Sequence, residues 1–162
     1  MSNEATLEAK VTHHFSADPD TIFMALTQEE TVRRWHHAWL GAMGLPDEVV
    51  RCDVDAREGG SFEMIGRRDE DEIRHAGRFE VLDRPKRLRF NWSVGSASTE
   101  GGSTVTIILE TAPDEDGTNA TLYQELPNAS EEAAAQAEQG WLAMLGAIDG
   151  TLRKMPQPDS DA

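Results

Sequence analysis

The most informative segment of this chain for its architecture is Ser130–Lys154, SEEAAAQAEQGWLAMLGAIDGTLRK. Ser130 can cap a helix, and Glu131 and Glu132 after it favour a helix N-terminus because their charges complement the helix dipole. Apolar residues then recur at the three- and four-residue steps of one helix face: Ala137, Trp141, Met144, Leu145, Ile148 and Leu152. A helix of about 24 residues at about 1.5 Å per residue rises about 36 Å, which is long enough to cross a whole sheet.

Upstream of this helix, short runs of sequence alternate apolar and polar residues. A repeat of two is how a strand presents one face to a core. Turn residues separate seven such runs, centred on residues 7–15, 50–54, 61–64, 73–81, 88–94, 105–109 and 120–126. By this alternation Val50, Cys52 and Val54 face inward together, and so do Phe79 and Val81.

Two short helices are expected after the first strand. Asp18 and Pro19 supply an N-cap followed by a proline at the first helical position. A second helix is expected from Gln28 to about Trp35, where acidic residues begin it and arginines end it. Glycines and a proline interrupt residues 39–46, so we expect an irregular, apolar connection there.

The order of these elements predicts an α+β fold. The chain is expected to form one strand, two short helices, six consecutive strands and a long helix. Elements in this order give a curved antiparallel sheet of about seven strands with the last helix packed over it. The chain of 162 residues suits a single domain. We assign that domain to residues 1–154 and a flexible tail to residues 155–162, which contain two prolines and two aspartates but no apolar stripe.

Composition excludes several classes of partner. Thirty acidic and fifteen basic residues give a formal charge of −15, so the phosphates of nucleic acid or of an anionic bilayer would repel this surface. No apolar run approaches the roughly 20 residues of a membrane span. The first twelve residues do not resemble a signal peptide, and the lone Cys52 has no disulfide partner. We therefore expect a cytoplasmic protein with neither a nucleic-acid nor a membrane partner.

Several short motifs, taken in order, resemble those of one family: FSADPDTIFMALT at 15–27, DAREGG at 55–60, PKRL at 85–88, Trp92, and Gly140-Trp141. Together they resemble the heat-shock protein 90 ATPase activator homologue-like family over nearly the whole chain. This resemblance implies the helix-grip fold of the START-like (SRPBCC) superfamily, which includes polyketide cyclases and the birch-pollen allergen. It also implies a function within a wide range, because members of that superfamily bind lipids, hormones or polyketides and some act as cyclases.

The candidate ligand site is the space between the predicted sheet and the last helix. Methionines adapt to irregular ligand shapes, and tryptophans supply contact area with one N–H donor. The residues expected to bind a ligand come from every surrounding segment: Trp35, His36, Trp39, Met43, Phe62, Met64, His75, Phe79, Phe90, Trp92, Gln124, Trp141, Met144 and Leu145. A filled core needs the same residue types, so the periodicity is equally consistent with a packed interior and with a vacant one.

The histidines and the cysteine do not predict a metal or cofactor. His13 and His14 are neighbours on a strand and point to opposite faces, and no Cys/His/Asp cluster has ligand spacing. His13 and His75 share the inward parity of their strands, which suits either a core histidine or a polar group in the cavity. His36 suits either a ligand contact or stabilisation of a helix C-terminus. Cys52 is expected to be an inert buried thiol.

We therefore predict a protein that binds a small, largely hydrophobic molecule without a cofactor. One alternative is an enzyme of the cyclase or hydratase type, in which His75 or His13 moves a proton; no catalytic residue is assigned. Another is a chaperone-interacting module or a homodimer that uses exposed apolar surface near residues 35–46.

Overall fold

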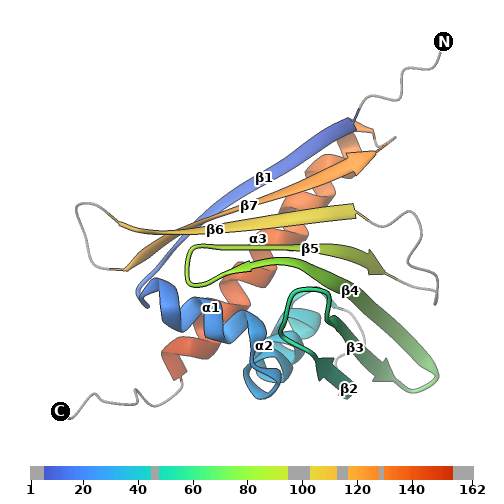
Figure 1. Ribbon diagram of the computed structural model, residues 1–162. Coiled ribbons are helices and arrows are strands. Elements are labelled where there is room, and N and C mark those ends of the chain that lie inside the picture. Colours follow the sequence, from blue (N-terminus) through green and yellow to red (C-terminus); the bar gives the residue numbers. More distant parts are fainter. Residues whose placement is uncertain (1–5, 45–47, 95–102, 113–116, 128–129, 155–162) are drawn as a thin grey trace.

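The computed structural model describes residues 6–44, 48–94, 103–112, 117–127 and 130–154. Their strands form one antiparallel sheet in the order β1-β7-β6-β5-β4-β3-β2 (Figure 1). The strands are β1 (Thr6–Phe15), β2 (Glu48–Val54), β3 (Ser61–Arg68), β4 (Asp71–Asp83), β5 (Arg87–Val94), β6 (Ser103–Thr111) and β7 (Thr118–Pro127). Each strand from β2 to β7 pairs with its neighbour in sequence, and β1 pairs with β7.

Three helices pack with this sheet, and the long one crosses behind it (Figure 1). They are α1 (Pro19–Thr27), α2 (Glu29–Ala42) and α3 (Glu131–Lys154). The Ser130 hydroxyl caps α3 by accepting a hydrogen bond from the Ala133 backbone N–H at 3.1 Å. The apolar face of α3 is buried against the sheet, with Ile148 fully buried. The α+β architecture predicted from the sequence is therefore confirmed, whereas residues 155–162 lie outside the described part of the chain.

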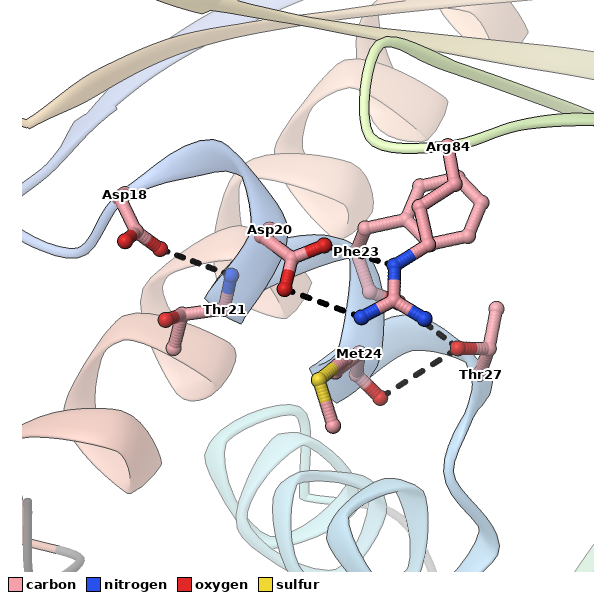
Figure 2. Close-up of polar contacts among 7 residues, drawn as sticks. All are labelled: Asp18, Asp20, Thr21, Phe23, Met24, Thr27 and Arg84. Carbon is pink, nitrogen blue, oxygen red and sulfur yellow. Dashed lines mark hydrogen bonds and ion pairs between the residues drawn. The ribbon is translucent and has the colours of Figure 1, made fainter. Parts of the chain in front are cut away.

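Helix α1 begins as the sequence predicts. The Asp18 carboxylate accepts a hydrogen bond from the Thr21 backbone N–H at 2.9 Å, and Pro19 is the first helical residue. Beside this cap, the Arg84 guanidinium donates two hydrogen bonds to the Asp20 carboxylate at 2.6 and 3.0 Å (Figure 2). Because Arg84 lies between β4 and β5, this ion pair joins α1 to the turn that connects those strands.

Helix α2 is longer than the sequence analysis predicted. It continues past Trp35 to Ala42, so the first half of the expected irregular connection, residues 39–42, is helical. Its buried residues follow helical spacing to the end: Thr31, Val32, Trp35, His36, Trp39 and Leu40. Burial of this face outweighs the low helix propensity of Gly41, which stands one residue before the end of the helix. Residues 45–47 lie outside the described chain.

Two β-bulges change the predicted alternation of side chains. In β2 the register shifts between Val49 and Arg51, so Val50 is exposed while Val49 packs against the core. In β4 a second shift follows Phe79, and Leu82 instead of Val81 packs against the core. The inward positions predicted for Val50 and Val81 are therefore wrong, because an extra residue in a bulge reverses the facing of the residues after it.

Candidate functional site

A small apolar pocket lies where the three helices meet strands β2 to β5. Its volume is about 30 Å³, close to the share of one molecule in liquid water. It is lined by Leu26 of α1, Val32 and Trp35 of α2, Val54 of β2, Phe62 and Met64 of β3, Phe79 of β4, Leu88, Phe90 and Trp92 of β5, and Met144 of α3. The wall has no charged side chain, and in this conformation the lining side chains leave little space between them.

Half of the predicted ligand-binding residues line this pocket. They are Trp35, Phe62, Met64, Phe79, Phe90, Trp92 and Met144. Four aliphatic lining residues were not predicted from the sequence: Leu26, Val32, Val54 and Leu88. The strand alternation and the helical spacing place all four inward, so the signal was present. They were missed because the prediction of ligand contacts was confined almost entirely to aromatic, methionine and polar side chains.

The structure places Met43 outside the pocket. Its side chain is 42% exposed at the C-terminal cap of α2. The Met43 methyl group instead lies against α3, 3.7 Å from the position that a Cβ on Gly140 would take. Because α2 continues to Ala42, Met43 reaches the neighbouring helix and not the sheet.

Behind the pocket wall, two buried histidines lie among tryptophans. His36 of α2 and His75 of β4 have ring centroids 5.6 Å apart and nearly perpendicular rings. His75 stacks on Trp92 at 5.1 Å, and Trp39 lies 4.9 Å from His75. His36 is 0% and His75 3% exposed. Trp92 also lines the pocket, as does Trp35, which contacts His36, so the histidine pair lies directly behind pocket-lining side chains.

The histidine pair has hydrogen-bonding groups without partners. Both ring nitrogens of His36, and Nδ1 of His75, are buried and form no hydrogen bond within the described chain. Burial lowers the pKa of His36 to about 4, and repulsion from His37 adds to the effect. Burial also lowers the pKa of His75 to about 3, with repulsion from His36 adding. Both rings are therefore uncharged at neutral pH. The alternative role of His36 in stabilising a helix C-terminus is wrong, because its side chain lies inside the core.

The other polar groups near the pair have partners. The Trp141 indole donates to the Gln124 side-chain carbonyl at 2.6 Å. The Trp39 indole donates to the Gly140 carbonyl at 3.2 Å, and the Trp35 indole to the Ala25 carbonyl at 2.9 Å. Among the predicted ligand-binding residues, Trp39, Gln124, Trp141 and Leu145 are thus buried beside the pocket without lining it. The unused hydrogen-bonding capacity of this region belongs to the two histidines.

His13 has a different role from either role expected for it. Its side chain is 27% exposed, and its Nε2 lies 2.8 Å from the Asp149 carboxylate of α3. Arg153 donates to the other oxygen of Asp149 at 3.0 Å. Burial alone would raise the pKa of Asp149, but the hydrogen bonds with His13 and Arg153 lower it overall. His13 thus links β1 to α3 and does not line the pocket.

Cys52 is an unreactive thiol, as predicted. It is buried, and burial raises its pKa to about 11, so the thiolate is scarce at neutral pH. Within the described residues, no group of three or more His, Cys, Asp and Glu side chains could hold a metal ion.

A curved antiparallel sheet packed around a long C-terminal helix defines the class of protein: this is the helix-grip, START-like fold. The sequence profile of the family described as activator of Hsp90 ATPase homolog 1-like protein matches residues 16–153, and the chain belongs to that family. No curated protein is a significant sequence match.

Solved structures share this fold at low sequence identity. An HSP90 activator from Plasmodium falciparum, PFC0360w, is 18% identical with a TM-score of 0.65, over 91% of this chain and 96% of that one. DynU16, from the dynemicin biosynthetic locus, is 18% identical with a TM-score of 0.68, over 91% of this chain and 47% of its own. A Staphylococcus aureus protein of unknown function is 14% identical with a TM-score of 0.72, over 93% and 98% of the two chains. At these sequence identities, the structural similarity shows only that the proteins share a fold.

No helix within the described residues has both the length and the apolar character needed to cross a membrane.

Proposed function

We propose that this protein binds a small, largely apolar molecule between its sheet and α3. The observation that carries this proposal is the pocket wall, which gathers eleven apolar side chains from all three helices and four strands at one point. Small-molecule sites in proteins are concave and mostly apolar in this way, with a few polar groups that orient the ligand.

Binding requires the pocket to expand, since about 30 Å³ holds no organic ligand. Met64 and Met144 are the adaptable parts of the wall because the methionine side chain is unbranched and changes shape easily. Val54 is the one lining residue that is only half-buried, and it belongs to β2 at the edge of the sheet. We therefore expect a ligand to enter beside β2, where the fewest contacts have to be broken.

The first experiment looks for the ligand itself. Native mass spectrometry of freshly purified protein is expected to show a co-purifying molecule, or a panel of apolar metabolites is expected to raise the thermal midpoint of unfolding, because a ligand that binds only the folded state stabilises it. If nothing co-purifies and no compound raises the midpoint, the proposal is wrong.

A pair of substitutions on α3 then locates the site. Met144→Phe puts a rigid ring into the pocket wall and is expected to weaken binding about tenfold or more, since the wall can no longer yield. Leu142→Phe makes a similar change two residues away, where the side chain is 45% exposed, and is expected to leave binding unchanged. Calorimetric titration of both variants measures the difference. Equal effects of the two substitutions would place the ligand elsewhere.

A second candidate function is contact with a protein partner, such as a chaperone ATPase or a second copy of this chain. It is supported by the family to which the chain belongs and by two exposed apolar side chains, Met43 at the end of α2 and Leu142 on α3. Stimulation of a chaperone ATPase by this protein, lost in a Met43→Gln variant, would favour this function over ligand binding.

The cyclase or hydratase alternative has less support. A general base works best with a pKa near the working pH, and the pKa of His75 lies at about 3. His13, the other histidine considered for this role, does not line the pocket.

A further inference from the structure

We propose that His36 and His75 form the polar end of the ligand site and bind the uncharged hydroxyl group of an aromatic ligand, such as a phenol. This inference rests on the proposed function, because it assigns a ligand class to the same pocket. The apolar wall holds the body of the ligand, and the histidine pair selects its head group.

The histidine pair has hydrogen-bonding capacity that the protein does not use. Three ring nitrogens of His36 and His75 are buried without a partner in the described chain. A buried polar group without a hydrogen bond costs stability, so such groups are rare in native proteins. The tryptophans around the pair do not satisfy these nitrogens, since the indoles of Trp35, Trp39 and Trp141 donate elsewhere. A ligand that supplied the missing partner would recover that stability.

The histidine pair lies next to the residues that line the pocket. His75 lies directly opposite Met64 across the β3–β4 pairing, and Met64 lines the pocket. Trp92 stacks on His75 and also lines the pocket. A displacement of the Trp92 ring would therefore join the pocket and the pair into one space, with the histidines at its closed end.

The charge and the shape of the surroundings of the pair limit which head group it can bind. A neutral imidazole offers one donor and one acceptor, and a hydroxyl group can use both. A carboxylate has no donor, and the rings in contact with the pair, Trp35, Trp39 and Trp92, carry no charge to balance it. These flat rings favour a flat ligand, because offset and edge-to-face ring contacts are stabilising. The pair therefore fits a hydroxylated aromatic molecule better than an acid.

Three probe compounds of one shape test this inference: 2-naphthol, 2-methylnaphthalene and 2-naphthoate. Titration into ¹⁵N-labelled protein, followed through the indole N–H signals of its four tryptophans, gives each dissociation constant and reports on the site. We expect 2-naphthol to bind about tenfold more tightly than 2-methylnaphthalene, as one well-formed hydrogen bond would produce. We expect 2-naphthoate to bind no more tightly than 2-methylnaphthalene.

Single substitutions then assign the preference to the pair. In His36→Phe and in His75→Phe the preference for 2-naphthol is expected to fall to about onefold to threefold, while 2-methylnaphthalene still binds. The matched control is His37→Phe, the next residue of α2, whose side chain is exposed. This control is expected to keep the tenfold preference. A preference that survives both pair substitutions overturns the inference.

The outcomes separate this inference from the proposed function. If 2-methylnaphthalene or 2-naphthoate binds native protein as tightly as 2-naphthol, the proposed ligand-binding function is supported but the role of the histidines is refuted. If none of the three compounds binds, the inference fails, and the ligand search described under the proposed function decides whether the pocket has any ligand. The comparison in native protein needs no variant, so the inference can be refuted even if a variant misfolds.

Discussion

His36 and His37 are neighbours in sequence, yet they have different chemistry. His36 is fully buried in the core, where burial lowers its pKa to about 4, whereas the side chain of His37 is exposed. His75 joins His36 from a strand 39 positions further along the chain, and its pKa is lowered still further. The pair is the most perturbed set of titratable groups beside the pocket, and its titration has a measurable consequence.

We predict that the protein loses stability as the pH falls from about 6.5 toward 4. Histidine in the unfolded chain has a pKa near 6.5, but in the folded protein the values are about 4 and about 3, so protons bind preferentially to the unfolded chain. Above pH 6.5 both histidines are uncharged in the folded and in the unfolded chain, so the free energy of unfolding is not reduced by their protonation. At pH 5 the free energy of unfolding is lower by on the order of 2 kcal/mol per histidine, and it decreases further as the pH falls.

Urea unfolding measured between pH 4.5 and 7.5 checks this prediction. The double variant His36→Phe/His75→Phe is expected to show a much flatter dependence on pH, because it lacks both groups. His37→Phe serves as the control and is expected to keep most of the native slope, because burial is the main cause of the low pKa of His36 and repulsion from His37 is the smaller one. The explanation would be wrong if the double variant and the native protein lost stability in parallel.

At the scale of single elements, α1 shows two contacts of different kinds side by side (Figure 2). The Asp18 carboxylate caps the helix through the Thr21 backbone N–H, while Asp20 pairs with Arg84 on the neighbouring turn. The hydrogen bond to Arg84 lowers the pKa of Asp20. The cap replaces a missing hydrogen bond of the helix, whereas the ion pair is open to water and screened by salt.

We predict that the cap matters more than the ion pair. Asp18→Ala is expected to lower the free energy of unfolding by about 1 kcal/mol, and Asp18→Asn, which keeps a capping oxygen, by much less. Asp20→Asn is expected to cause a smaller loss that disappears at high salt. Denaturant unfolding of the three variants at low and high salt checks these expectations. A salt-independent loss for Asp20→Asn larger than that for Asp18→Ala would contradict them.

The elements also show where sequence periodicity fails. Helical spacing predicted the extent of α3 because its apolar stripe is uninterrupted and its cap is local. The predicted end of α2 came too early, because Gly41 signals a break that tertiary burial of Trp39 and Leu40 overrides, whereas Gly44 lies beyond the end of the helix. The bulges in β2 and β4 left no mark in the sequence, since any residue type can occupy the extra position.

At the scale of the whole molecule, negative charge dominates the surface. The formal charge is −15. Described ion pairs on the outer face of the sheet, such as Arg89 with Glu80 and Arg67 with Glu72, join neighbouring strands. Such exposed pairs contribute about 0–1 kcal/mol each. These pairs leave the excess of acidic residues unbalanced, so the carboxylates on the surface of the folded chain repel one another.

We predict that added salt stabilises the folded protein. Raising NaCl from about 0.1 M to about 1 M shortens the screening length from about 10 Å to about 3 Å, which weakens the repulsion among carboxylates more than it weakens a few contact pairs. Unfolding in urea at several salt concentrations, repeated with KCl, measures this effect. Stability that is indifferent to salt, or that falls with it, would show that net repulsion is unimportant here.

Local spacing and local hydrogen bonds were enough to predict the fold class, the order of the elements, the cap of α1 and the full length of α3. The same spacing placed the pocket-lining aromatic and methionine residues on inward faces. The space that these residues enclose could not be predicted, since a filled and a vacant core need the same side chains, and it became visible only once the layers were packed. The contact between His36 and His75 likewise depends on how the helix layer packs on the sheet. No local sequence pattern encodes the distance between these two rings, because they come from distant segments of the chain.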